Sequence, residues 1–357
     1  MNTALVTGGS GYVAGHLVEL LLREGYRVHT TVRNASGAKK LRHLSGLKDR
    51  HKDNIQLFEA DLLKEGSFEE AMQGCDTVFH VASPFFMPEQ IKDGRKQLLE
   101  PALNGTRNVL NSVNNCESVK RVVLTSTVGA IFGDYADVLE MEGGILSEKY
   151  FNTSSTLEDN PYHYSKVIAE KEAWNICGRQ SRWTMVTINP GLVLGPSLTA
   201  SSESGSLFLL NELLKGYFFY GAPGFSFTYA DVRDVALAHL KAAQREGSSG
   251  RYIIAEKEMI SFLEMSRIIR PRHKRPYLLP RHSVPDWAVR VLGPFFGLTQ
   301  DYIRKHLGIR FAVDNQRSIN ELGMTYRPVS ETLIDHYRSW AQWQSSGRES
   351  LDRRKGL

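Results

Sequence analysis

A tyrosine and a lysine stand four positions apart, at Tyr162 and Lys166. Asn160 is a good helix N-cap and Pro161 a good first helical residue, so we predict that a helix begins there. Residues four positions apart lie on one face of a helix. The positive helix terminus and the neighbouring ammonium both favour a phenolate, so the pKa of Tyr162 should fall. Such a pair suits general acid catalysis, in which a phenol protonates a carbonyl oxygen while hydride attacks the carbon.

Hydroxyl side chains end a predicted strand earlier in the chain, at residues 125–127. This strand belongs to the same predicted sheet as the elements around the Tyr162 helix. A tyrosine and a lysine at this spacing also occur by chance on many helices. The nearby hydroxyl groups are therefore what strengthens the functional interpretation of the pair.

The start of the chain holds a second motif. An apolar run at 4–7 precedes a glycine-rich turn at 8–15, which leads into an amphipathic segment. A strand, a glycine turn and a helix in this order are typical of a dinucleotide-binding fold, whose helix N–H groups attract phosphates. Gly8 permits the tight turn, Gly11 lets the backbone approach a pyrophosphate, and Ala14 lets the helix pack close to the strand.

Positive side chains follow the second predicted strand. Arg33 comes directly after Val32, and Lys39, Lys40 and Arg42 follow. Folds that bind NAD usually carry an acidic residue near this position. An arginine instead can grip a phosphate with two N–H groups and stack on adenine. The cluster therefore favours NADP(H); the alternative interpretation is a solvated basic helix.

Two more strand ends could contact a cofactor. Asp61 follows the third predicted strand, where its carboxylate could accept from an adenine amino group or cap the next helix. Residues 81–84 lie at the end of the fourth strand, at the carboxyl edge of the sheet, where open α/β folds bind ligands.

Short apolar strands alternate with helical patterns through the first half of the chain. We predict strands at 5–7, 28–32, 55–60, 77–81, 121–125 and 184–189, and helices at 13–23, 67–72, 95–113 and 162–177. This alternation implies a parallel sheet covered on both faces. Handedness rules then make the α/β fold doubly wound, that is, a Rossmann sheet.

After residue 195 the pattern becomes more irregular, with helical stretches at 207–214, 231–244 and 332–343 and a strand at 252–255. We expect an NADP-binding Rossmann domain at 1–194, to which 229–255 returns. A smaller C-terminal substrate-binding lobe would comprise 195–228 and 256–345. The charged segment 346–357 is expected to be a flexible tail.

Composition limits the class of protein. Of the 357 residues, 41% are hydrophobic and 23% charged, and the net charge of +5 falls short of a nucleic-acid footprint. No apolar run is long enough to cross a bilayer, and the first strand begins too close to Met1 for a signal peptide. The three cysteines and eleven histidines fit no metal or disulfide pattern. We therefore expect a cytoplasmic protein with no metal and with neither nucleic acid nor membrane as partner.

Taken together, the motifs resemble those of the extended short-chain dehydrogenases/reductases. They are TGGSGYVA at 7–14, VASPFF at 81–86, LTST at 124–127, YHYSK at 162–166 and NPGLVLGP at 189–196, with further likeness at 229–236 and 320–328. The resemblance covers most of the chain. It is greatest to the dihydroflavonol reductase and cinnamoyl-CoA reductase branch and its microbial ketone and aldehyde reductase relatives.

The resemblance implies a role for each matching residue. Tyr162 would donate the proton, and Lys166 would hold the nicotinamide ribose and depress the tyrosine pKa. The hydroxyl that positions the carbonyl falls at Thr127, with Ser126 as the adjacent alternative. The expected cofactor contacts are these two residues of the helix together with Gly8, Gly11, Tyr12, Val13, Arg33, Lys40, Asp61, Leu62, Val81, Ala82, Ser83, Pro190, Gly191, Leu192 and Val193.

Two departures from the family bear on the substrate. Residues 160–164 read Asn-Pro-Tyr-His-Tyr rather than the Asn-Trp-Tyr-Cys-Tyr of cinnamoyl-CoA reductases, which argues against a CoA thioester. Ile131 and Phe132 stand where flavonoid reductases place an amide side chain, so an apolar or aromatic carbonyl compound should fit better than a polyphenolic flavonoid.

These observations predict an NADPH-dependent carbonyl reductase that acts on a small-molecule ketone or aldehyde, or oxidises the alcohol in reverse. The alternatives are a nucleotide-sugar epimerase or dehydratase, a sterol-type alcohol dehydrogenase, and a non-catalytic redox sensor that binds NADP(H). The sequence leaves the oligomeric state open.

Overall fold

The computed structural model describes residues 2–34, 38–83, 91–200 and 204–355, and for 38–40 and 346–355 it describes the backbone alone. A seven-stranded sheet lies at its centre, in the order β11-β7-β5-β4-β1-β2-β3, with every strand pair parallel. The strands are β1 (Thr3–Val6), β2 (Arg27–Val32), β3 (Ile55–Glu59), β4 (Thr77–His80), β5 (Arg121–Thr125), β7 (Thr184–Pro190) and β11 (Gly250–Ile254). The predicted doubly wound parallel sheet is confirmed.

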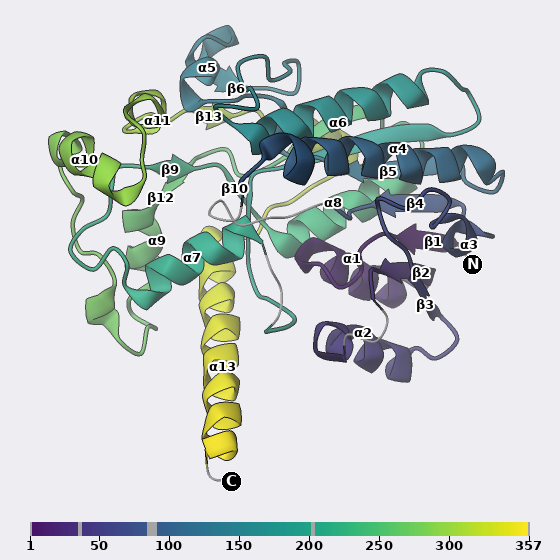
Figure 1. Ribbon diagram of the computed structural model, residues 1–357, viewed down its shortest axis with the longest axis horizontal. Helices are drawn as coiled ribbons and strands as arrows, with labels where there is room; N and C mark the ends of the chain where they lie inside the picture. The colour runs from purple at the N-terminus through teal and green to yellow at the C-terminus, as the bar shows by residue number, and fades with distance from the viewer. Residues whose placement is uncertain (1, 35–37, 84–90, 201–203, 356–357) are drawn as a thin grey trace.

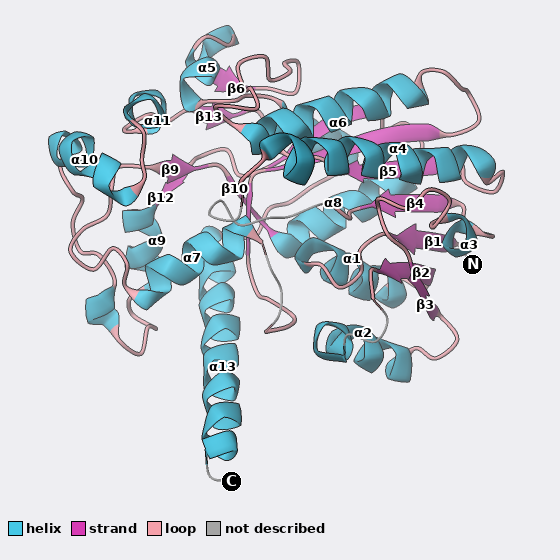
Figure 2. Ribbon diagram, in the orientation of Figure 1, coloured by secondary structure: helices cyan, strands magenta, loops and turns pink. Residues whose placement is uncertain are grey.

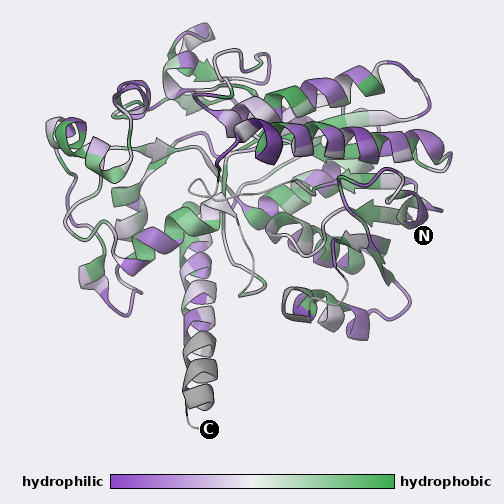
Figure 3. Ribbon diagram, in the orientation of Figure 1, coloured by the Kyte–Doolittle hydropathy of each residue, from purple (hydrophilic) through white to green (hydrophobic). Residues whose placement is uncertain are grey.

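Helices cover both faces of this sheet (Figures 1 and 2). One face carries α1 (Tyr12–Arg23), α2 (Ala38–Arg50) and α8 (Val232–Gln244), whereas the other carries α3 (Glu69–Met72), α4 (Glu100–Asn115) and α6 (Pro161–Cys177). Because side chains alternate along a strand, Ala4 and Val6 join the first core and Leu5 joins the second. In Figure 3 the strands are mostly hydrophobic, and α4 and α6 carry many hydrophilic residues on the side in view.

The predicted helix at 95–113 is two elements. Residues Arg95–Leu99 form a π-helical turn, and α4 begins at Glu100. Pro101 has no backbone N–H to donate to a carbonyl one turn earlier, so the regular hydrogen-bond ladder is interrupted there. The widened turn lies beside the pocket described below, to which Pro101 and Ala102 contribute.

The other main elements are mostly short, apart from the 27-residue α13, and supply two further cores. They are η3 (Val128–Ala130), α5 (Tyr135–Leu139), β6 (Ile145–Leu146), β8 (Leu192–Leu194), α7 (Gly205–Lys215), β9 (Ser226–Phe227), β10 (Tyr229–Asp231), β12 (Ile260–Ser261), α9 (Phe262–Ile269), α10 (Asp286–Leu292), α11 (Gln300–His306), β13 (Ala312–Val313), α12 (Gln316–Leu322) and α13 (Val329–Lys355). Residues of α7, α9, α10, α11 and the first half of α13 share one hydrophobic cluster. The domain boundaries and the flexibility of 346–357 stay predictions.

The far end of α13 projects away from the other elements in Figure 1. Within the described ranges, no helix is both long and apolar enough to span a membrane.

Candidate active site

The glycine turn lies where the strand order reverses. Strands β2 and β4 flank β1, so the chain leaves β1 at the switch point at which open α/β sheets bind ligands. Gly8 has a φ of +71°, and a Cβ there would come within 3.0 Å of the Ala82 side chain at the end of β4. Gly9 is a second tight position, because a Cβ would lie 2.0 Å from Thr30 Oγ1. The spacing of the glycine motif predicted no role for Gly9.

The N-terminus of α1 is open to a phosphate group. Gly11 is the N-cap and has no side chain, and no described side-chain hydrogen bond caps this terminus. Tyr12 is predicted as a cofactor contact, yet its buried hydroxyl donates to the carbonyl of Gly195 at 2.8 Å. Only the backbone of Tyr12, like that of Val13 in the same turn, therefore faces the anion site.

The expected phosphate and adenine contacts lie at the ends of β2 and β3. Arg33 follows Val32 and is exposed. Lys40 lies in the first turn of α2, but its side chain is outside the described residues. The Asp61 carboxylate accepts from the N–H of Leu63 at 2.9 Å, which makes a local turn. The interpretation of Asp61 as the cap of the next helix is therefore wrong, because α3 begins only at Glu69.

The end of β4 is tied to β1 by a threonine. Thr7 Oγ1 accepts from the N–H groups of Val81 and Ala82 at 3.0 and 2.9 Å. His80 is buried and its Nδ1 lies 3.1 Å from the same oxygen, so this histidine has a hydrogen-bond partner inside the core. Ser83 follows and is exposed. Phe85 and Phe86 of the motif at 81–86 lie outside the described residues.

The helix that carries the tyrosine and lysine begins as predicted. Asn160 Oδ1 accepts from the N–H of His163 at 3.2 Å, and Pro161 is the first residue of α6. Lys166 Nζ lies 5.8 Å from the centre of the Tyr162 ring, so the two side chains share a face. The ammonium also donates to Ser83 Oγ at 2.7 Å, which brings α6 to the end of β4.

The expected fall in the tyrosine pKa is wrong for the protein as it stands. Desolvation raises the pKa of Tyr162 above its ordinary value, although the residue is 39% exposed. Burial also lowers the pKa of Lys166 to about 8, despite the opposing charge of Glu170. The ammonium is turned toward Ser83, so it does not offset the loss of solvent at the phenol.

The two candidate hydroxyls after β5 lie in different surroundings. Ser126 is buried and donates to the Glu170 carboxylate. Thr127 is half-buried and its Oγ1 accepts from the N–H of Gly129 at 3.2 Å. The ring of His163 covers Gly129, where a Cβ would clash at 2.4 Å, so α6 packs directly on the segment that follows Thr127.

The remaining predicted cofactor contacts lie at the end of β7 and in the residues that follow it. Pro190 closes β7, and Leu192 and Val193 are half-buried in β8. Gly191 between them packs against the backbone of Thr228, since a Cβ would lie 2.8 Å from that carbonyl.

A pocket joins several of these elements. Its lining includes Leu62, Ala82, Ser83 and Lys166, all predicted site residues, together with Ser126 and Glu170. Within the described ranges, no group of three or more His, Cys, Asp or Glu side chains could hold a metal ion.

The two residues on which the expected substrate class depends have buried side chains. Ile131 and Phe132 are 1% and 2% exposed. The Phe132 ring packs against Tyr135 and Phe311 at centroid distances of 5.9 and 5.7 Å. These two side chains therefore belong to a hydrophobic core, and any selection of substrate by them would be indirect.

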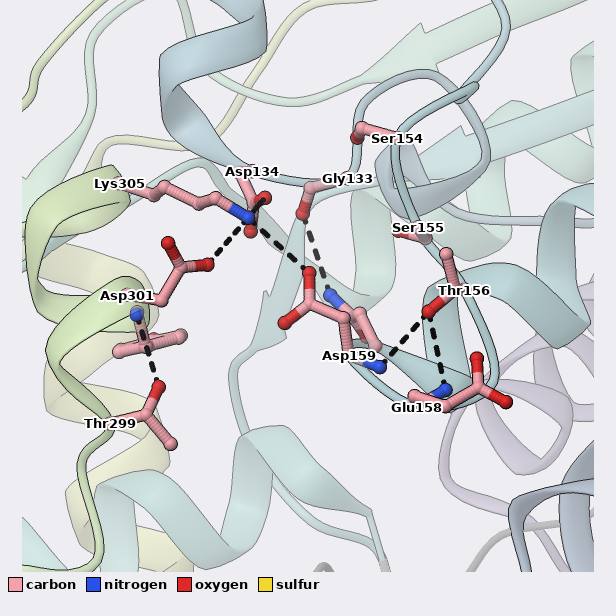
Figure 4. A network of polar contacts seen from close by, with 12 residues as sticks. Gly133, Asp134, Ser154, Ser155, Thr156, Glu158, Asp159, Thr299, Asp301 and Lys305 are labelled. Carbon is pink, nitrogen blue, oxygen red and sulfur yellow. Dashed lines mark hydrogen bonds and ion pairs between the residues drawn. The ribbon is translucent and has the colours of Figure 1, made fainter.

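A polar cluster anchors the loop before α6 (Figure 4). Lys305 of α11 points its Nζ at three carboxylates, 2.9 Å from Asp134, 3.4 Å from Asp159 and 2.7 Å from Asp301. Asp159 immediately precedes the N-cap of α6, so this ion-pair network links α11 to the start of the candidate catalytic helix.

Comparison with known proteins agrees with this geometry. Residues 4–255 match the model of the NAD dependent epimerase/dehydratase family. Cinnamoyl-CoA reductase CAD2 of Medicago truncatula is 40% identical over 271 residues, which cover 75% of this chain and 80% of the relative. An anthocyanidin reductase of Vitis vinifera is 36% identical, covering 80% and 83%.

The fold has solved counterparts. The yeast methylglyoxal/isovaleraldehyde reductase Gre2, complexed with NADPH, superposes with a TM-score of 0.75 at 26% identity and covers 96% of this chain and 99% of its own. The chain therefore belongs to the NAD dependent epimerase/dehydratase family, the extended short-chain dehydrogenases/reductases, in the branch that contains the cinnamoyl-CoA and anthocyanidin reductases.

Proposed function

We propose that this protein is an NADPH-dependent carbonyl reductase that delivers hydride to an apolar or aromatic ketone or aldehyde. The observation that carries the proposal is the shared face of Tyr162 and Lys166, which α6 places beside the end of β4 at the ligand-binding edge of the sheet. A phenol and an ammonium at this edge can protonate the oxygen of a carbonyl group.

The chain is an oxidoreductase that uses NADP(H), in common with the reductases it resembles. Its own residues fit the cofactor, because the α1 N-terminus is free of a capping side chain and glycines line the turn before it. Arg33 is exposed at the end of β2, where it can contact a ribose phosphate. The bound cofactor would supply the hydride.

The candidate catalytic groups have complementary proton-transfer roles. The ordinary pKa of a phenol lies well above neutral and burial raises that of Tyr162 further, so the proton that it would donate is present at neutral pH. Thr127 Oγ1 already accepts from Gly129, which leaves its hydroxyl hydrogen available to a carbonyl oxygen. Ser126 is the weaker candidate, because its hydrogen is engaged by Glu170.

The names of the relatives support a carbonyl substrate with an apolar or aromatic body. They include reductases named for cinnamoyl-CoA, an anthocyanidin, methylglyoxal and isovaleraldehyde. Cinnamoyl-CoA and anthocyanidins contain aromatic rings, whereas methylglyoxal and isovaleraldehyde are small aliphatic carbonyl compounds. An aromatic or branched aliphatic aldehyde or ketone is the class we propose for this chain.

An absorbance assay of NADPH consumption tests the proposal. Purified protein is mixed with NADPH or NADH and a panel of aromatic and aliphatic aldehydes and ketones, with cinnamoyl-CoA and a nucleotide sugar as comparison substrates. Loss of NADPH absorbance with a ketone or aldehyde, faster than with NADH, is expected. Conversion of the nucleotide sugar without net loss of NADPH would contradict the reductase assignment and favour an epimerase. NADPH binding without turnover of any substrate would favour a sensor.

A further inference from the structure

The carboxylate of Glu170 lies at the centre of a buried polar network. Glu170 is 2% exposed and follows Lys166 by one turn of α6. It accepts hydrogen bonds from Arg251 Nε at 2.6 Å, from Asn189 Nδ2 at 2.9 Å and from Ser126 Oγ. These donors come from three neighbouring strands or strand ends, β11, β7 and β5.

Two of these donors also hold the segment that contains the candidate hydroxyl. Asn189 Nδ2 donates to the carbonyl oxygen of Thr127 at 3.1 Å. Arg251 Nη2 donates to the carbonyl oxygen of Ala130 at 3.2 Å, and its guanidinium stacks 3.9 Å from the Phe151 ring. Both ends of the short helix η3 are therefore fixed by side chains that Glu170 holds.

The network thus joins two parts of the site that are far apart in sequence. Tyr162 and Lys166 are carried by α6, whereas Thr127 is carried by the end of β5. Apolar packing between a helix and a sheet tolerates small sliding movements, whereas a buried carboxylate with five polar or charged donors, the three above together with Thr187 and Trp174, restricts such movement. Glu170 supplies this directional link, with its side chain in the same pocket lining as Lys166 and Ser126.

We propose that Glu170 is a positioning residue that sets the placement of the Thr127 hydroxyl relative to the Tyr162–Lys166 pair and supports the ammonium of Lys166. Glu170 itself touches neither substrate nor cofactor in this assignment. The inference rests on the proposed reductase function for its catalytic consequence, but the link between α6 and the Thr127 segment can be measured without turnover.

The charges around Lys166 give the link a second consequence. The titratable groups that face its ammonium are Tyr162 and Glu170 of α6 and His80 of β4. Burial lowers the pKa of His80 to about 3, so this histidine is neutral near pH 7. Arg251 faces Glu170 from β11. The negative charge of Glu170 raises the pKa of Lys166 against the larger effect of burial, so removing it favours the neutral amine.

The test replaces Glu170 by an amide of the same shape. We expect Glu170→Gln to lower kcat about 10- to 100-fold, because small misplacements of reacting groups have effects of this order. The dissociation constant for NADPH should stay within about threefold of wild type, and the alkaline limb of the kcat–pH profile should move to lower pH. Hydrogen exchange at residues 126–130 should accelerate, a readout independent of activity.

A matched control separates positioning from general stability. Asp234 is a buried carboxylate of α8 that pairs with Arg327, away from α6. Asp234→Asn should cost comparable stability yet leave the pH profile and the exchange of 126–130 unchanged. If Glu170→Gln does not fold, Ser126→Ala removes one bond of the network and keeps the charge; it should lower kcat and accelerate exchange at 126–130 without moving the pH limb.

The outcomes distinguish the two proposals. Unchanged exchange at 126–130 in Glu170→Gln or in Ser126→Ala, or equal effects in Asp234→Asn, would overturn the positioning role. A wild-type protein that reduces no carbonyl compound would overturn the reductase assignment, whereas faster exchange at 126–130 in the variants would still support the link.

Discussion

Lys166 Nζ donates a 2.7 Å hydrogen bond to Ser83 Oγ, so a side chain of α6 holds the end of β4 at the edge of the sheet. Burial lowers the pKa of Lys166 to about 8, and among the described residues only the charge of Glu170 opposes this shift. The ammonium is therefore present below that pH and is lost as the pH rises through it. The raised pKa of Tyr162 means that the phenol loses its proton only at higher pH.

The first prediction concerns the pH profile. Carbonyl reduction should fall as the pH rises through about 8, and Ser83→Ala should move this limb to lower pH because the charged lysine loses an acceptor. The profile of kcat/KM from pH 6 to 10 measures the effect. Ser112→Ala, which removes a buried hydroxyl in α4 that donates to Asn108, is the control and should leave the limb in place.

The second prediction concerns the proton donor. Tyr162→Phe removes one oxygen from an otherwise unchanged face of α6, so kcat should fall about 100- to 10,000-fold, the range expected for a lost general acid. Fluorescence titration should give an NADPH dissociation constant close to that of wild type. Tyr164→Phe serves as the matched control on the same helix. Turnover of Tyr162→Phe within a few-fold of wild type would contradict the assigned role.

The third prediction concerns the choice of nicotinamide cofactor. Arg33 is exposed at the end of β2, and a charge-assisted bond to a phosphate is worth about 1.5–3 kcal/mol. Arg33→Ala should therefore raise the dissociation constant for NADPH about 10- to 100-fold and that for NADH hardly at all. Arg23→Ala, which removes a distant exposed guanidinium at the end of α1, is the control. If Arg33→Ala weakened the binding of NADPH and NADH equally, the proposed contact between Arg33 and the ribose phosphate would be contradicted.

The sheet could be predicted from sequence because its strands are buried on both faces and therefore read as short apolar runs, such as 121–125 and 184–189. The start of α6 could be predicted because its cap, Asn160, is local. The partners of Glu170 could not, since Ser126 and Arg251 are brought to it only by the tertiary fold.

Burial accounts for the other differences between expectation and structure. The pKa of Tyr162 depends on how much solvent the surrounding chain excludes, which helix spacing alone does not report. Ile131 and Phe132 stand close to Thr127 in sequence, yet their side chains enter a hydrophobic core. The direction in which a loop turns after a strand decides this, and no periodic pattern encodes it.

The last prediction concerns the ion-pair network that holds the loop before α6 (Figure 4). Hydrogen bonds that Lys305 donates to Asp301 and Asp134 raise the pKa of Lys305, so the contribution of its charge to stability is fully present at neutral pH. Lys305→Met leaves the buried Asp134 carboxylate without this cation, and the free energy of unfolding should fall by about 1 kcal/mol. Urea denaturation at low and high salt measures the change, and added salt should reduce it.

Neighbouring Arg304 provides the comparison for Lys305. Its side chain is 72% exposed and pairs with Asp301 alone among the described residues. Arg304→Met should change the free energy of unfolding by a few tenths of a kcal/mol at most, because exposed pairs on a helix contribute little. Because Asp159 adjoins the cap of α6, Lys305→Met should also accelerate hydrogen exchange at the start of that helix, and Arg304→Met should not. Equal behaviour of the two variants would show that the network is a surface feature without influence on the site.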